Sequence, residues 1–142
     1  MSGTFAQRLQ WFDNNPALLR SLSLLQRGVE KESLRVADNT GVLAQSGHPE
    51  SLGSALCHPK ITTDYSEALL EFITPVFNTI PECLQCLTDI HHFTYQQLAA
   101  QNEMLWTHSM PCVLGKTDND IPIALYGSSN VGKMKSVYRL GL

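Results

Sequence analysis

Two carboxylates, Glu30 and Glu32, stand one residue apart in the segment RGVEKESLRV, residues 27–36. Successive side chains of a strand point to opposite faces, so in a strand these two would share one face, with their Cα atoms about 6.6 Å apart. Leu34 and Val36 would lie on the same face. Two anions at about 7 Å repel by ~0.6 kcal/mol in water and by ~2.4 kcal/mol at an effective dielectric near 20. On an open surface that cost is negligible, but in a cleft it calls for a cation.

A second segment, ITTDYSEALLEFITP, repeats this pattern. If LLEFIT is a strand, Glu71 shares a face with the apolar Leu69 and Ile73, and Asp64 precedes it in the same segment. A buried ionised carboxylate is costly unless it is paired or bound to a metal. Hard cations such as Mg²⁺ take carboxylate oxygens together with the phosphate oxygens of a nucleotide. Four residues are therefore candidate metal ligands: Glu30, Glu32, Asp64 and Glu71.

Each of these carboxylates also has an interpretation without a metal. The first two glutamates and the basic residues around them would fit the solvated face of a helix, although Gly28 opposes a helix there. Asp64 would fit a capping role toward Glu67, and Glu71 would fit an ion pair. The sequence leaves these alternatives open.

The segment GSSNVGKM, residues 127–134, has the G-x-x-x-x-G-K spacing of a phosphate-binding P-loop. A P-loop needs Ser or Thr after the lysine to hold Mg²⁺, and here Met134 follows Lys133. The preceding segment IPIALY contains Pro122, which suits an edge strand better than the centre of a parallel sheet. A glycine-rich turn that lines a polar ligand is favoured, and a P-loop nucleotidase is the weaker alternative. Three basic residues are candidates to meet phosphate or carboxylate, or to form a solvated face: Lys133, Lys135 and Arg139.

A C-x-x-C pair, Cys83 and Cys86, precedes His91 and His92. Zinc or redox chemistry would need a second ligand pair or a thioredoxin-like βαβ unit. Both cysteines fall inside an amphipathic helical pattern, so a packing role is favoured.

Composition excludes several classes of partner. The net charge of −3 gives no electrostatic case for nucleic acid or an anionic membrane. No apolar run approaches the roughly 20 residues of a membrane span, and the first residues resemble neither a signal nor a transit peptide. A cytoplasmic location is the expectation.

The periodicity predicts an α+β fold with a mostly antiparallel sheet and flanking helices. Helices are expected from Phe5 behind a Thr4 cap, over ALLRSLSLL, and from Thr79, where a capping box begins. Strands are expected in RGVEKESLRV, LLEFIT, PCVLG and IPIALY, with a hairpin through DNTG into VLAQ. No linker divides the 142 residues, and 43% of them are hydrophobic, which suffices for one core.

Several long blocks taken together resemble one family. They are RGVEKESLRV, GHPESLGSALCHP, ITTDYSEALLEFITP, SMPC and YGSSNVGKMKSVYRLGL, in order from about Arg27 to Leu142. They look like the N-terminal part of the proteobacterial type of glutamate–cysteine ligase. The resemblance implies that residues 1–142 are an incomplete N-terminal portion of a single catalytic domain with a glutamine-synthetase-like fold.

The family joins the γ-carboxylate of L-glutamate to the amine of L-cysteine with ATP, through a γ-glutamyl phosphate, as the first step of glutathione synthesis. The resemblance implies that Glu30, Glu32, Asp64 and Glu71 bind Mg²⁺, or Mn²⁺ in its place, and that ATP is the co-substrate. The cysteine pocket would use Tyr65, Tyr138 and Leu142, with Arg139 as a carboxylate or phosphate contact and Lys133 as a phosphate contact.

The chain departs from the family pattern at three positions: Tyr65 replaces Phe, Lys133 replaces Arg, and Leu140 replaces Glu. Family members are also several times longer, and their remaining part carries a metal-binding histidine, further acidic ligands and much of the ATP pocket. We therefore expect this chain alone to be weakly stable and inactive. A non-catalytic fragment or binding remnant is the alternative from another class.

Overall fold

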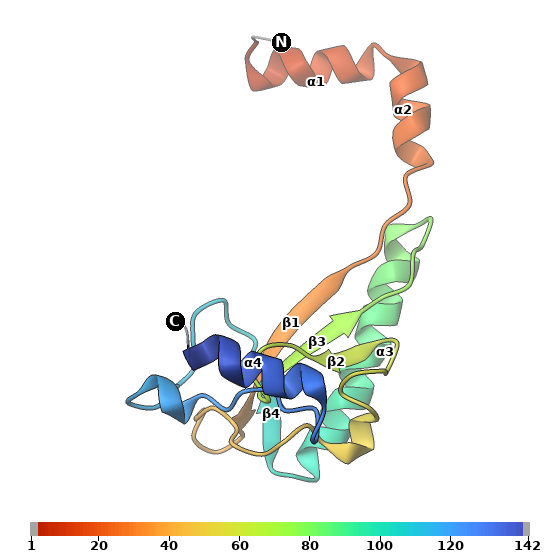
Figure 1. Ribbon diagram of the computed structural model, residues 1–142. Coiled ribbons are helices and arrows are strands. Elements are labelled where there is room, and N and C mark those ends of the chain that lie inside the picture. The colour runs from red at the N-terminus through yellow and green to blue at the C-terminus, as the bar shows by residue number, and fades with distance from the viewer. Residues whose placement is uncertain (1–2, 141–142) are drawn as a thin grey trace.

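The computed structural model describes residues 3–140, which form an α+β fold around one antiparallel sheet (Figure 1). The sheet has the strand order β2-β3-β1-β4. Its strands are β1 (Glu30–Ala37), β2 (Ile61–Thr63), β3 (Leu69–Ile73) and β4 (Glu103–Leu105). The helices are α1 (Phe5–Asp13), α2 (Pro16–Ser23), α3 (Ile80–Ala99) and α4 (Asn130–Leu140), with 3₁₀ turns at η1 (Glu50–Leu52) and η2 (Asp118–Asp120). The predicted fold class is confirmed.

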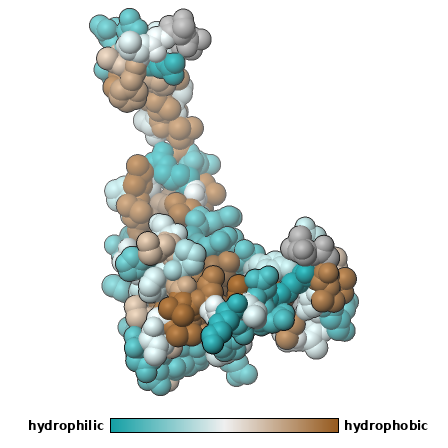
Figure 2. Space-filling model, turned by 90° about the vertical axis from the view of Figure 1, so that its left-hand side faces the viewer, coloured by the Kyte–Doolittle hydropathy of each residue, from teal (hydrophilic) through white to brown (hydrophobic). Residues whose placement is uncertain are grey.

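Helices α1 and α2 form an arm that stands away from the sheet (Figure 1). Thr4 caps α1 through the Gln7 amide, as predicted, and Asn15, for which no cap was predicted, caps α2 through the Leu18 amide. Neither helix buries a residue, and apolar side chains colour much of the arm's surface in Figure 2.

Strand β1 is the centre of the sheet and pairs with two partners in turn. Its first half pairs with β3, from Glu30 opposite Ile73 to Leu34 opposite Leu69. Its second half pairs with β4, from Arg35 opposite Leu105 onward. The helical alternative for residues 27–36 is therefore wrong.

One face of the sheet packs against α3. Ile61, Leu70 and Phe72 alternate toward this face and form a buried cluster with Ile90 and Leu98 of the helix. Fully burying such side chains contributes about 1.5–3 kcal/mol each. Thr79 begins α3, with its side chain accepting from the Glu82 amide, which confirms the predicted cap.

The C-x-x-C pair belongs to this packing. Cys83 is buried beside the Thr74 hydroxyl, and Cys86 is half-buried against the core. The His91 ring packs on Phe72 with 4.8 Å between ring centroids, and its Nδ1 bonds the Leu87 carbonyl. The packing interpretation of these cysteines is confirmed.

The other face of the sheet is covered along only part of its length. A second buried cluster contains Val36, Leu43, Ala44, Ala68 and Cys112, and loops hold it against the second half of β1. The same face of the first half of β1 carries Glu30 and Glu32, which are exposed. This division leaves an open, acidic end on an otherwise packed face.

Two predicted strands are wrong. PCVLG and IPIALY form only isolated bridges, Val42 with Val113 and Ser66 with Ile123. Pro122 lacks an amide proton, and its carbonyl instead accepts from the Glu67 amide and the Ser66 hydroxyl. VLAQ likewise contributes only single bridges, from Leu43 to Val36 and from Val42 to Val113, instead of a hairpin strand, whereas β4 was not predicted. No helix in residues 3–140 is long and apolar enough to cross a membrane.

Candidate functional site

The open end of the sheet brings together carboxylates from separate strands. Glu32 of β1 lies directly opposite Glu71 of β3, and Glu71 lies directly opposite Thr62 of β2. Directly opposed residues point to the same face with Cβ atoms about 4.5–5.5 Å apart. The Thr62 hydroxyl donates to the Glu71 carboxylate at 3.1 Å. The three side chains therefore form one row across the sheet.

The other two predicted ligands flank this row. Glu30 lies two residues from Glu32 on β1 and shares its face. Asp64 follows β2, and its amide donates to the Leu69 carbonyl at 3.0 Å, which continues the ladder by one residue. All four carboxylates thus lie on the face opposite α3. We call Glu30, Glu32, Asp64 and Glu71 the carboxylate face.

Glu32 is the electrostatic centre of the carboxylate face. Partial burial raises its pKa above the ordinary value, and the negative charges of Asp64, Glu71 and Glu30 raise it further, in that order. The four side chains are therefore close enough to repel one another, so a bound cation would relieve that repulsion.

The chemistry of this donor set suits a hard divalent cation. All donors are carboxylate oxygens, which Mg²⁺ and Mn²⁺ prefer, and Mg²⁺ keeps several waters while binding one or two carboxylates. Within residues 3–140, no three or more His, Cys, Asp or Glu side chains are arranged so that they could hold a metal ion by themselves. A cation on the carboxylate face would therefore need water or phosphate oxygens as further ligands.

Two specific alternatives are wrong: the capping role of Asp64 toward Glu67 and the ion pair of Glu71. The Glu67 amide donates to the Pro122 carbonyl at 2.9 Å, so it is not capped by Asp64. In the part of the chain that the structure describes, no basic side chain lies within 4.0 Å of Glu71.

One of the three basic residues named as candidates to meet phosphate or carboxylate, Lys135, lies beside Asp64. Lys135 of α4 donates to the Asp64 carbonyl at 2.7 Å, and its Nζ is 4.0 Å from the Asp64 carboxylate. Lys133, the predicted phosphate contact, is exposed on the same helix. The sequence named Lys135 as a possible carboxylate contact, but it did not indicate that the carboxylate would be that of Asp64.

The predicted substrate residues are only partly brought together. Tyr65 and Arg139 line one cavity of about 470 Å³ with residues of the η2 turn. The Tyr65 hydroxyl is buried without a hydrogen-bond partner among the described residues, and Arg139 donates to the Ile121 carbonyl at 2.6 Å. Tyr138 is exposed and does not line this cavity, and Leu142 lies outside the described residues.

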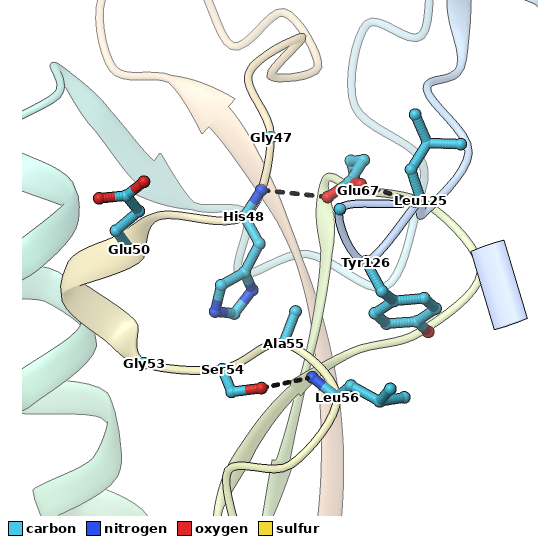
Figure 3. Close-up of a pocket in the computed structure, with 11 residues that line it drawn as sticks. Gly47, His48, Glu50, Gly53, Ser54, Ala55, Leu56, Glu67, Leu125 and Tyr126 are labelled. Carbon is cyan, nitrogen blue, oxygen red and sulfur yellow. Dashed lines mark hydrogen bonds between the residues drawn. The ribbon is translucent and has the colours of Figure 1, made fainter. Parts of the chain in front are cut away.

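A second cavity, of about 430 Å³, lies between the loop of residues 47–56 and the turn of residues 125–127 (Figure 3). The Glu67 carboxylate joins its walls by accepting from the amides of His48 and Leu125. The His48 ring points into the cavity in Figure 3, with Nδ1 2.6 Å from the Thr63 hydroxyl. Burial lowers the pKa of His48, and the nearby Arg35 charge lowers it further.

Arg35, which was not predicted to have a role, holds part of the wall of this cavity. It is fully buried, pairs with Glu103 at 2.6 Å, and donates to the carbonyls of Ser46, Gly47 and Glu67. A buried guanidinium with several acceptors fixes the loops that carry those acceptors.

Comparison with known proteins gives a consistent answer. The family model described as glutamate-cysteine ligase matches residues 9–142. The chain is 55% identical to the glutamate–cysteine ligase of Alcanivorax borkumensis over 122 residues, which are 86% of this chain and 22% of that protein. It is 51% identical to that of Pseudomonas putida strain W619 over 142 residues, which are 100% of this chain and 26% of that protein.

Two solved structures share the fold. The structure of a Francisella tularensis glutamate–cysteine ligase in complex with AMP matches with a TM-score of 0.71 and 45% identity, over 82% of this chain and 23% of that one. A bifunctional glutathione synthetase from Pasteurella multocida matches with a TM-score of 0.72 and 28% identity, over 91% and 16%.

The chain spans about a quarter of the length of the curated relatives it matches. The family model nevertheless covers nearly all of this chain, and the carboxylate face lies wholly within the match. The chain therefore belongs to the glutamate–cysteine ligase family.

Proposed function

We propose that this chain contributes the metal-binding part of an ATP-dependent ligase that joins the γ-carboxylate of L-glutamate to the amine of L-cysteine. One observation carries the proposal: in a chain of this family, carboxylates from three adjacent segments share one open face. There, partial burial and then the negative charges of the other three raise the pKa of Glu32. The AMP complex of the Francisella relative supports nucleotide use.

The carboxylate face would hold Mg²⁺, or Mn²⁺ in its place. When bound, the metal neutralises phosphate charge and orients the nucleotide for phosphoryl transfer. The carboxylates supply the oxygens that grip the cation, and the Thr62 hydroxyl fixes the rotamer of Glu71 through its 3.1 Å hydrogen bond. The apolar cluster around Val36 packs against the other half of β1, next to the carboxylates.

The reaction would proceed in two steps. A glutamate γ-carboxylate oxygen attacks the γ-phosphorus of ATP, and ADP leaves, which gives the γ-glutamyl phosphate. The cysteine amine then attacks the carbonyl carbon of this acyl phosphate, loses a proton and expels phosphate. Because phosphoryl transfer depends on positioning and charge neutralisation, the contribution of this chain is mainly electrostatic.

The cavity beside Tyr65 is the proposed cysteine pocket. The Tyr65 hydroxyl, which has no hydrogen-bond partner among the described residues, can bond a polar group of the substrate. The remaining donors of Arg139 can reach a carboxylate. Lys133 and Tyr138 are exposed, so they would meet phosphate or substrate from the surface of α4. Leu142, which lies outside the described residues, is proposed as a pocket residue from the family resemblance. The location proposed for the reaction is the cytoplasm, and the net charge of −3 argues against nucleic acid or an anionic membrane as a partner.

A graft tests this proposal. Residues 1–142 would replace the matched quarter of the Pseudomonas putida W619 ligase, which aligns over the whole chain. We expect the graft to form γ-glutamylcysteine in a reaction that needs Mg²⁺, ATP and both amino acids, detected by mass spectrometry and by ADP release. In the graft, Glu32→Gln should lower the rate at least a hundredfold, whereas Glu50→Gln, which removes the same charge elsewhere, should not.

Two results would contradict the proposal. A folded graft without Mg²⁺-dependent product would favour a non-catalytic remnant. Equal activity of Glu32→Gln and Glu50→Gln would remove the carboxylate face from the site. For the 142-residue chain by itself, we expect weak or undetectable binding of Mg·ATP by isothermal titration, because most of the length of its relatives is absent.

A further inference from the structure

Helix α4 carries two lysines, and the ammonium group of Lys135 is hydrogen-bonded whereas Lys133 is exposed. Its Nζ donates to the Asp64 carbonyl at 2.7 Å and to the Tyr126 hydroxyl at 2.5 Å. It also lies over the Tyr126 ring, 4.7 Å from the centroid, and 5.8 Å from that of Tyr65. The side chain is 21% exposed. An ammonium has three donors, so two are used here and the third is free to face the Asp64 carboxylate at 4.0 Å.

Tyr126 completes this arrangement. Its hydroxyl accepts from Lys135 and lies 2.6 Å from the Thr63 carbonyl and 3.0 Å from the Asp64 carbonyl. Tyr126 has φ of 48°, a left-handed conformation that costs a bulky residue about 1–2 kcal/mol. Gly127, with φ of 68°, follows it, and together they turn the chain into α4. The strained turn places the ring so that its hydroxyl meets the end of β2.

We propose that Lys135, through Tyr126, is the positioning residue that fixes the end of β2 and so aims Asp64 at the metal. The inference rests on the proposed metal role of Asp64. Lys135 and Tyr126 bond the backbone carbonyls of Thr63, the last paired residue of β2, and of Asp64, which follows it. Without them, the Asp64 backbone would be held by its amide bond to the Leu69 carbonyl alone, and its carboxylate would have to be ordered on metal binding.

Whether loss of Lys135 weakens or strengthens metal binding distinguishes a positioning role from a purely electrostatic one. A cation 4.0 Å from Asp64 repels an incoming divalent ion, so loss of the charge alone would strengthen metal binding. Loss of positioning would weaken it. Lys133 provides a matched control, because it is a lysine of the same helix, two residues away and exposed.

The test measures Mn²⁺ binding to the 142-residue chain by paramagnetic broadening of amide signals near Glu32 and Asp64. We expect Lys135→Met to weaken Mn²⁺ binding about tenfold, Tyr126→Phe to weaken it by a similar factor, and Lys135→Arg to recover most of the loss. The double variant should lose no more than either single variant, because the two side chains act as one unit. Lys133→Met should bind as the unaltered chain does.

Each contrary result overturns the inference. Unchanged or tighter binding by Lys135→Met, relative to Lys133→Met, would show that Lys135 does not position Asp64. Absence of broadening in the unaltered chain, together with an unaltered graft whose rate does not depend on Mg²⁺, would remove the metal role itself. If Lys135→Met does not fold, as judged by its amide spectrum, Tyr126→Phe decides, because it removes only one oxygen.

Activity of the ligase graft distinguishes this inference from the proposed function. In an active graft, Lys135→Met should raise the Mg²⁺ concentration for half-maximal rate about tenfold and leave kcat at saturating Mg²⁺ nearly unchanged. An active graft whose Mg²⁺ dependence is the same in Lys135→Met and Lys133→Met overturns the inference alone. An inactive graft, combined with Mn²⁺ binding that depends on Lys135, overturns the ligase proposal alone.

Discussion

Replacing Glu32 with Gln should stabilise the metal-free chain while damaging its metal site. Glu32 lies opposite Glu71 on one open face. Partial burial raises the pKa of Glu32, and the negative charges of Asp64, Glu71 and Glu30 raise it further. At a carboxylate separation of about 6 Å, one such repulsion amounts to ~0.7 kcal/mol in water, and salt screening at 0.15 M cuts it by about half. Summed over three neighbours, the variant should gain about 0.5–1 kcal/mol.

For a chain of this length, that gain corresponds to a rise in Tm of about 1–4 °C. The assay is thermal unfolding of the 142-residue chain in EDTA and again with Mg²⁺. In EDTA, Glu32→Gln should melt above the unaltered chain. With Mg²⁺ at ten times its Kd, the unaltered chain should gain about 1.4 kcal/mol and the variant much less, which reverses the order.

The pH dependence has a definite sign. A raised carboxyl pKa means that the folded state binds the proton more tightly than the unfolded state does. The stability from this proton is present at low pH and is lost as pH rises through the folded-state pKa of Glu32. The advantage of Glu32→Gln in EDTA should therefore be small at pH 4 and full at pH 7.

Glu50→Gln is the control, since it changes the net charge equally at a site outside the carboxylate face. Two results would refute the reasoning. One is a variant no more stable than Glu50→Gln in EDTA at pH 7. The other is a variant that keeps the full Mg²⁺-dependent gain.

Three further substitutions test other parts of the structure. Arg35→Met should lower the free energy of unfolding by about 3–5 kcal/mol in urea titration, because it leaves the Glu103 carboxylate without its buried partner; a loss below 1 kcal/mol would contradict this. Gly132→Ala should destabilise by about 1–3 kcal/mol, since the added Cβ would meet the backbone around Leu125, whereas Gly47→Ala, with open space, should cost under about 1 kcal/mol; equal losses would show that α4 does not pack this closely. Tyr65→Phe should leave the chain as stable or up to about 1 kcal/mol more stable, because the hydroxyl is buried without a partner among residues 3–140, and a clear loss in urea would reveal a bond that it makes.

Local pattern alone determined the strands that carry the candidate site. Alternation in residues 30–36 and 69–73 predicted which side chains share a face, and β1 and β3 confirm it. Period-two alternation is a property of the backbone, so it can be read without knowing the neighbouring strand. The caps at Thr4 and Thr79 were predicted for the same reason, because a cap involves only residues within one turn.

Short apolar segments were wrongly predicted to be strands. IPIALY has strand-like composition, but Pro122 gives up the amide that a ladder needs, and the segment bonds the loop before β3 instead. Strand β4 has only three residues and forms because β1 extends beyond the end of β3. Whether a partner edge exists is decided by the fold and not by the segment itself.

Only the tertiary structure decided which charged residues meet. The register that sets Glu32 opposite Glu71 joins segments almost forty residues apart, and nothing local fixes it. Lys135 contacts Asp64 across 71 positions, and Arg35 contacts Glu103 across 68. The sequence determined the chemical types and faces of the carboxylates. The fold determined their neighbours, because long-range pairing depends on how all the elements pack at once.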